Sequence, residues 1–197
     1  THMLHSGQDS IRNGRFEISF VVPFDIQFSN QKGRLVFYAH DDVLKAEANG
    51  HSEAFTLGGI STDGANDKQG PKIYAYLNNE DFQDGGTVNA QPFFVAHLED
   101  ASGINVSGNG VGHDLELCID GNPQHTYNLN EHYTGEFGNF TQGTVSFSIP
   151  TLSPGAHTLT FRAWDVLNNT SQTTLHFVVD EEYKPQLLQL SATQNPA

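Results

Sequence analysis

The fold of this chain is constrained most by short runs in which apolar and polar residues alternate, separated by glycine and proline. Leu159, Phe161 and Ala163 alternate with threonine and arginine, and after the next turn Leu175 and Phe177 repeat the pattern. A period of two places one set of side chains on each face of a β-strand, so these runs predict half-buried strands. No apolar pattern with helical spacing extends beyond two turns, and its best example, residues 128–133, is too short to matter. The sequence therefore predicts an all-β chain.

Turn residues separate these runs at the spacing typical of a sandwich of two sheets. The predicted strands cover residues 15–22, 34–39, 52–57, 72–77, 93–99, 115–119, 144–149, 157–164 and 172–179. We expect an immunoglobulin-like or fibronectin type III-like β-sandwich, preceded by a smaller β segment. Its core should contain Leu159, Phe161, Leu175 and Phe177.

Composition divides the chain into successive segments. Residues 1–10 begin with Thr1-His2-Met3, typical of a cloning remnant, and are expected to be a flexible start. Residues 11–60 form a β segment that can belong to an upstream sandwich domain, and the polar, glycine-rich residues 61–70 are a linker. Residues 71–180 form the β-sandwich domain. We expect residues 181–197 to connect it to a further C-terminal domain.

Charge and cysteine content narrow the classes of function. The formal net charge is -14, from 9 basic and 23 acidic residues, so no basic surface is available for nucleic acid or anionic lipid. No stretch approaches the roughly 20 consecutive apolar residues that span a bilayer. One cysteine, Cys118, permits no internal disulfide, which suits both a cytosolic protein and a bacterial protein exported without disulfides.

The residues with catalytic chemistry do not form a recognisable active-site motif. Cys118 would need a base such as His113 or His125 to act as a nucleophile, and the neighbouring carboxylates disfavour its reactive thiolate form. The ten histidines show no spacing typical of zinc enzymes. In each of the pairs Glu80-Asp81 and Glu99-Asp100, the two adjacent residues are expected to point to opposite faces of a strand. Neither pair therefore forms a facing acid and base by itself. We expect no catalytic or cofactor-binding residue in this chain.

Calcium is the strongest of the cofactor hypotheses. Asp63, Asn66 and Asp67 share one polar loop, and Asp165 and Asn168 follow a predicted strand. Aspartate and asparagine are also ordinary turn residues, which close turns through nearby backbone amides. We therefore expect no metal ligand in the chain. The loop of residues 103–114 and the loop after Trp164 should be ordered by packing and hydrogen bonds.

Several motifs in fixed order resemble a known family and cover nearly the whole chain. The motifs are Asn13-Gly14-Arg15-Phe16, Gly70-Pro71-Lys72-Ile73-Tyr74, Gly85-Gly86-Thr87-Val88-Asn89, Ala101-Ser102-Gly103-Ile104-Asn105, Gly108-Asn109-Gly110-Val111-Gly112-His113-Asp114, Leu129-Asn130-Glu131-His132-Tyr133, Leu152-Ser153-Pro154-Gly155-Ala156-His157, Trp164-Asp165-Val166-Leu167-Asn168-Asn169 and Ala192-Thr193-Gln194-Asn195-Pro196-Ala197. This order is similar to the region downstream of the peptidase domain in gingipain-type cysteine peptidases of Bacteroidetes that act as sortases of the type IX secretion system.

The resemblance implies a cell-surface or outer-membrane protein. Its relatives cleave C-terminal sorting domains from exported cargo and help attach the cargo to surface lipopolysaccharide. Their catalytic cysteine and histidine lie in the peptidase domain, and Cys118 does not match that motif. The implied role is a non-catalytic accessory region whose partners are the parent catalytic domain, secreted cargo or outer-membrane secretion components.

Two alternatives remain open at the level of sequence. The chain can be a carbohydrate-binding module of another secreted bacterial enzyme, which would require exposed aromatic side chains arranged as a platform. It can also be a structural spacer without a ligand. Fold alone does not decide between these functions, because β-sandwiches host unrelated activities.

Overall fold

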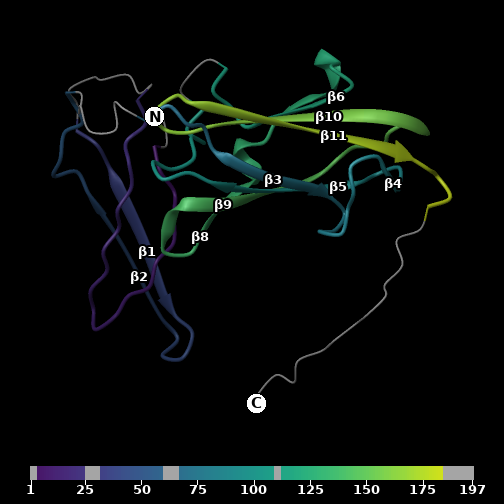
Figure 1. Ribbon diagram of the computed structural model, residues 1–197. Helices are drawn as coiled ribbons and strands as arrows, with labels where there is room; N and C mark the ends of the chain where they lie inside the picture. Colours follow the sequence, from purple (N-terminus) through teal and green to yellow (C-terminus); the bar gives the residue numbers. More distant parts are fainter. Residues whose placement is uncertain (1–3, 25–31, 60–66, 109–111, 184–197) are drawn as a thin grey trace.

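The computed structural model describes residues 4–24, 32–59, 67–108 and 112–183, and two packed sheets form most of it (Figure 1). One sheet has the order β4-β11-β10-β6-β7, and the other has the order β3-β5-β9-β8. The all-β class and the β-sandwich predicted from the sequence are confirmed. Among the described residues, no helix is long and apolar enough to cross a membrane.

All pairings within the sheets are antiparallel except the one between β11 and β4. The first sheet contains β4 (Gly86–Val88), β6 (Glu116–Ile119), β7 (Thr126–Asn128), β10 (Gly155–Trp164) and β11 (Thr170–Val179). The second contains β3 (Lys72–Leu77), β5 (Phe93–Glu99), β8 (Tyr133–Glu136) and β9 (Asn139–Ser148). Of two short 3-10 helices, η1 (Pro123–His125) connects β6 to β7 within the first sheet, and η2 (Asn130–His132) connects β7 to β8 of the second sheet.

The core lies between the two sheets, and the alternating residues of β10 and β11 form a large part of it. Leu159 pairs with Leu175, and the side chains of Phe161 and Phe177 are almost completely buried. Phe161 meets Phe94 of the opposite sheet with ring centroids 5.1 Å apart. The predicted core positions are therefore confirmed. Burial of these side chains is the main contribution to the stability of the sandwich.

Two further strands, β1 (Leu35–Asp41) and β2 (Ala46–Ser52), form a hairpin that projects from the sandwich (Figure 1). β1 corresponds to the predicted strand at 34–39. The predicted strand at 52–57 is wrong, because the partner of β1 begins at Ala46. β2 carries no large apolar residue, and its strand conformation comes from hydrogen bonding to β1 and not from its own pattern.

The prediction of a strand at 15–22 is also wrong. That segment makes only one isolated bridge, between Arg12 and Arg15, and it leaves Phe16 and Ile18 exposed. Alternation is not sufficient for a strand, because the backbone also needs a hydrogen-bonded neighbour. The segment instead follows the side of the sandwich, where Phe20 stacks on His5 and a cavity of about 410 Å³ separates it from Ile104 and Phe140.

The predicted linker is described only in part, because residues 61–66 lie outside the described ranges. The remainder contacts the sandwich closely, because a Cβ atom on Gly70 would clash with the backbone carbonyl of Thr170. Asp67 O accepts a hydrogen bond from Asn169 Nδ2. Of the predicted connector at 181–197, only residues 181–183 are described. The division into domains stays a prediction.

Candidate functional site

Cys118 lies in β6, and backbone carbonyls surround its half-buried thiol. Sγ lies 3.7 Å from Asn122 O and 3.9 Å from Ile119 O. The neighbouring strands place Thr160 and Thr126 beside it in register. None of these groups is a base that could take the thiol proton, as nucleophilic catalysis requires. The contacts are those of a structural cysteine.

The loop at 103–114, described except for residues 109–111, is joined to the sandwich by direct hydrogen bonds. Asn105 N donates to Trp164 O at 2.9 Å, and Val166 N donates to Gly103 O at 3.1 Å. At the other end, Asn130 Nδ2 donates to Asp114 Oδ1 at 2.7 Å. The ring of His113 lies 4.3 Å from that of Trp164. These contacts are the packing and hydrogen bonding that the sequence predicts for this loop.

The structure brings together three aspartates that are far apart in the sequence. Carboxylate oxygens of Asp67, Asp100 and Asp165 all lie within 4.8 Å of one another. Asp67 and Asp165 belong to the two loops weighed for calcium, whereas Asp63 and Asn66 lie outside the described residues. Nothing in the sequence indicated Asp100 as a possible metal ligand, because its nearness to Asp165 depends on how the end of β5 packs against the loop after β10.

Hydrogen bonds and burial set the electrostatics of this aspartate cluster. The fully buried Asp165 accepts hydrogen bonds from Leu167 N, Asn169 N and Asn169 Nδ2 at 2.7–2.9 Å. Burial, together with the charge of Asp100, raises the pKa of Asp165 in spite of these bonds. Asp100 Oδ1 accepts hydrogen bonds from Ser102 N and Oγ. The carboxylates could supply part of a calcium shell, which takes six to eight oxygens.

Two histidine–carboxylate pairs connect turns to strands. His157 Nδ1 lies 2.7 Å from Asp120 Oδ2, and His157 Nε2 lies 2.8 Å from Ser153 O. Asp84 accepts a hydrogen bond from His176 N at 2.6 Å and lies 3.1 Å from His176 Nδ1. Neither pair includes a nucleophile, so both act as links between elements of the fold.

The two carboxylate pairs weighed for glycosidase chemistry lie in different settings. Glu99 Oε1 points outward and contacts Lys72 Nζ at 3.1 Å, whereas Asp100 is buried. Asp81 N instead donates to the side chain of Asn79 in the turn that follows β3. Glu99 and Asp100 agree with the expectation that adjacent residues of a strand face apart. For Glu80 and Asp81 the premise is wrong, because both lie in the turn after β3 and not in a strand.

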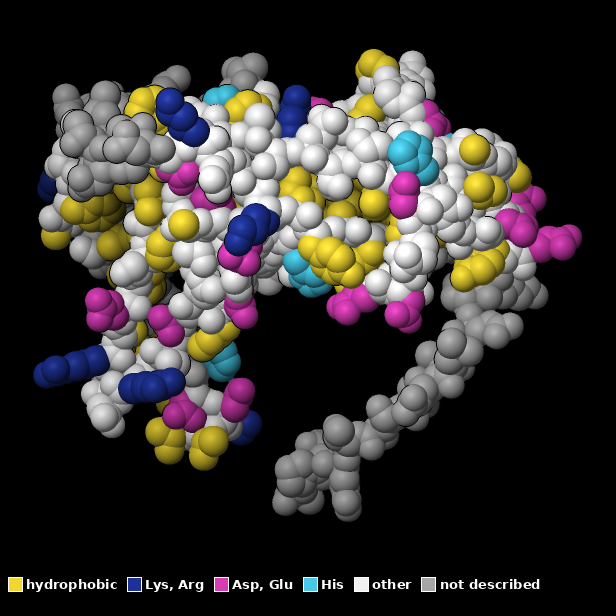
Figure 2. Space-filling model, in the orientation of Figure 1, with side chains coloured by type: hydrophobic (Ala, Val, Ile, Leu, Met, Phe, Trp, Pro, Cys, Tyr) yellow, Lys and Arg dark blue, Asp and Glu magenta, His cyan; other side chains and the backbone are white. Residues whose placement is uncertain are grey.

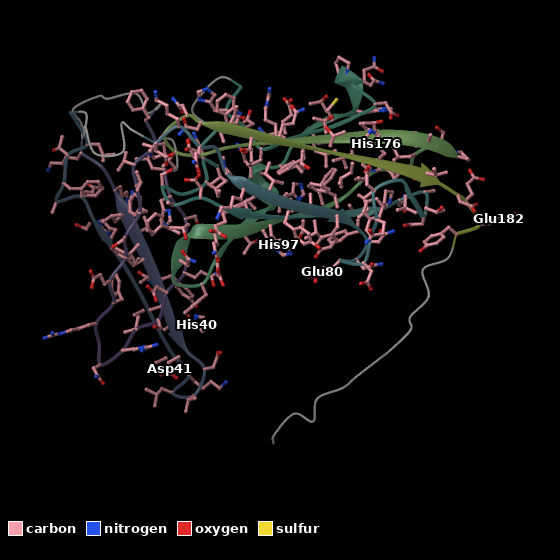
Figure 3. The ribbon with its side chains drawn as sticks, viewed as in Figure 1. His40, Asp41, Glu80, His97, His176 and Glu182 are labelled. Carbon is pink, nitrogen blue, oxygen red and sulfur yellow. The ribbon has the colours of Figure 1, made fainter. Side chains whose placement is uncertain are left out.

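The outer face of the β3-β5-β9-β8 sheet, which points away from the other sheet, carries a group of aromatic rings. Tyr74 stacks on His97 with ring centroids 6.2 Å apart and an angle of 11° between the planes. The Tyr76 ring lies 5.8 Å from that of Tyr74 and 5.9 Å from that of His97. Figure 3 labels His97 on this face and Glu80 in the turn after β3. Figure 2 shows hydrophobic, histidine and acidic side chains beside one another there.

Comparison with solved structures relates the chain to one known protein with high sequence similarity. It is similar to dimeric latent PorU from Porphyromonas gingivalis, with 38% identity and a TM-score of 0.61, over 85% of this chain. The match spans 16% of that PorU chain. A second match is the endo-beta-1,4-mannanase from Thermotoga petrophila, with 11% identity, a TM-score of 0.37 and coverage of 60% of this chain and 21% of that chain. The mannanase match is too distant to support an argument.

Neither family models nor curated proteins extend this comparison. No family model matches the chain. No curated protein matches it either. The identity to PorU is nevertheless high, extends over most of the chain and agrees with the order of motifs found in the sequence. The chain is therefore a PorU-related C-terminal region.

Proposed function

We propose that this chain is a non-catalytic accessory β-sandwich region of a cell-surface cysteine peptidase, the sortase of a type IX secretion system. The similarity to PorU carries this proposal. The setting of Cys118 supports it, because the contacts described for its thiol are with the carbonyls of Ile119 and Asn122, and the strand register places Thr160 and Thr126 beside it. The parent protein would cleave C-terminal sorting domains from exported cargo, outside the cytoplasm and at the outer membrane.

The accessory role consists of supporting the catalytic domain and docking cargo or secretion components. Two features of the described residues suit such a role. The β1-β2 hairpin leaves Tyr38, Val43 and Leu44 exposed, and the outer sheet face exposes Tyr74. Exposed apolar side chains on projecting elements are typical of surfaces that contact other domains.

The test is complementation between separate chains. A parent protein lacking residues 72–179 is assayed for cleavage of a cargo protein that carries its sorting domain, with and without the isolated chain added. We expect slow cleavage by the shortened parent and a higher rate when the chain is added. Cleavage by the shortened parent at the full rate, or cleavage by the isolated chain alone, would contradict the proposal.

A further inference from the structure

The outer face of the four-stranded sheet combines rings and hydrogen-bonding groups in an ordered way. Strand register forms cross-strand rows, of which the central one is Tyr74, His97 and Thr144. The rows on either side are Lys72, Glu99 and Gln142, and Tyr76, Val95 and Ser146. On this face the aromatic rings are therefore carried by β3 and β5, whereas amide and hydroxyl groups are carried by β9.

Sheet stability alone does not account for these rings. Cross-strand aromatic contacts do stabilise sheets, and Tyr76 fulfils that role by covering Val95, which is 8% exposed. Tyr74 differs, because 55% of it stays exposed beside an open hollow of about 700 Å³. A large ring left in water above a hollow is available to a ligand.

Hydrogen bonds and an ion pair hold this face in place. His97 Nδ1 lies 2.9 Å from Thr144 Oγ1, and His97 Nε2 lies 3.5 Å from Tyr76 Oη. Lys72 Nζ contacts Glu99 Oε1 at 3.1 Å, so the two charges at the edge of the hollow offset each other. The hollow is lined by Lys72, Tyr74, His97, Glu99, Gln142 and Thr144, among others. These bonds hold His97 in place, and Tyr74 packs against the rings of His97 and Tyr76, so part of the platform is ordered before any ligand arrives and the entropic cost of binding is lower.

A sugar ring has the complementary chemistry, with an apolar C–H face and an edge of hydroxyl groups. The Tyr74–His97 platform can stack against the apolar face, while Gln142, Thr144 and Glu99 can bond to the hydroxyls. The net charge of -14 repels anionic polymers, and among the described residues that line the hollow the one lysine, Lys72, is paired with Glu99. We propose that this outer face binds a neutral oligosaccharide, with Tyr74 as the main stacking residue.

The test uses an array of neutral and anionic glycans, followed by titration of the isotope-labelled chain with the neutral glycan that gives the strongest array signal. We expect backbone amide shifts at residues 72–76, 97 and 142–144. Tyr74→Ala should weaken binding by about tenfold or more, whereas Tyr74→Phe keeps the ring and should bind within about threefold of the parent chain. Thermal melts of each variant separate lost binding from lost folding.

Tyr38→Ala is a matched control, because Tyr38 also stacks on a histidine, His40, at 6.1 Å but lies on the hairpin. It should leave glycan binding unchanged. The proposal is overturned if no neutral glycan shifts these amides, if Tyr74→Ala binds as well as the parent chain, or if Tyr38→Ala causes the same loss. A preference for anionic glycans or for a protein partner at this face would also overturn it.

Discussion

His157 and Asp120 join the start of β10 to the turn after β6 through a contact of 2.7 Å between Nδ1 and Oδ2. Asp120 Oδ1 also accepts a hydrogen bond from Thr158 N, so the carboxylate holds both the backbone and the side chain of the neighbouring strand. Burial lowers the pKa of His157, but the bonds to Ser153 and Asp120 outweigh it and the net shift is upward. Burial raises the pKa of Asp120, and the bonds from Thr158 and His157 reverse that shift.

This pair predicts a defined pH dependence of stability. The raised pKa of His157 stabilises the fold fully below its ordinary value of 6.5, and the contribution is lost as pH rises through the folded-state pKa. The lowered pKa of Asp120 stabilises the fold at pH values above the ordinary pKa of 3.8, and this stabilisation is lost as pH falls through the folded-state pKa. His157→Gln should therefore lower the free energy of unfolding by about 1 kcal/mol between pH 3.8 and 6.5, and by less above neutral pH. The effect stays this small because Asp120 is partly exposed to solvent.

Denaturant unfolding of the unaltered chain and of the His157→Gln variant, repeated across the pH range, measures how the stability difference between them depends on pH. His176→Gln is the control, because its pair with Asp84 is largely exposed and should contribute less. A cost for His157→Gln that stays constant from acid to alkaline pH would show that the charge of the imidazole contributes nothing.

The core position of Phe161 predicts a large effect of truncation. Phe161 is fully buried against Phe94, so Phe161→Ala should cost about 3–5 kcal/mol in free energy of unfolding. Phe137→Ala is a matched control, because Phe137 is 60% exposed and should change stability by less than about 1 kcal/mol. Urea melts of the two variants test the prediction, and equal costs would contradict the packing described for β10.

The aspartate cluster predicts a stabilising substitution. Burial raises the pKa of Asp165, and the negative charge of Asp100 raises it further. The ionised form of Asp165 is therefore disfavoured in the folded chain. The raised pKa of Asp165 therefore stabilises the fold below the ordinary pKa of 3.8, and this stabilisation is lost as pH rises. In the presence of a chelator at neutral pH, Asp100→Asn should therefore raise the melting temperature. The amide oxygen of Asn can still accept the bonds from Ser102.

Melts in excess calcium test the expectation that these loops are ordered without metal. The bonds from Leu167 and Asn169 to Asp165 already close the loop, so calcium should shift the melting temperature little. A rise of several degrees that disappears in Asp165→Asn would contradict this expectation and assign the cluster to calcium.

The sequence predicted best the strands whose own residues carry the pattern. In β10 and β11 the alternation around Phe161 and Phe177 gives both the strand and its buried face, because one-sided burial fixes the register. β2 could not be predicted, because Ala46–Ser52 pairs through its backbone and has no apolar alternation. Residues 15–22 show the reverse case, an alternating pattern without a partner strand.

The candidate sites depended on pairing and packing more than on motifs. The polar loops that contain Asp67 and Asp165 were visible in the sequence, but Asp100 joins them only through the folded chain. The stacking of Tyr74 on His97 similarly depends on the register between β3 and β5. A single sequence carries no direct signal for such contacts.

Cleavage of a sorting-domain cargo by the full-length parent protein carrying Cys118→Ala tests the non-catalytic role most directly. The small structural change should leave kcat/KM within about twofold of the unaltered parent, because the contacts described for Cys118 Sγ are with the backbone carbonyls of Ile119 and Asn122. The isolated chain, assayed beside it with the same cargo and a thiol, should show no cleavage. Loss of cleavage in the Cys118→Ala parent, or cleavage by the isolated chain that this substitution abolishes, would contradict a non-catalytic region.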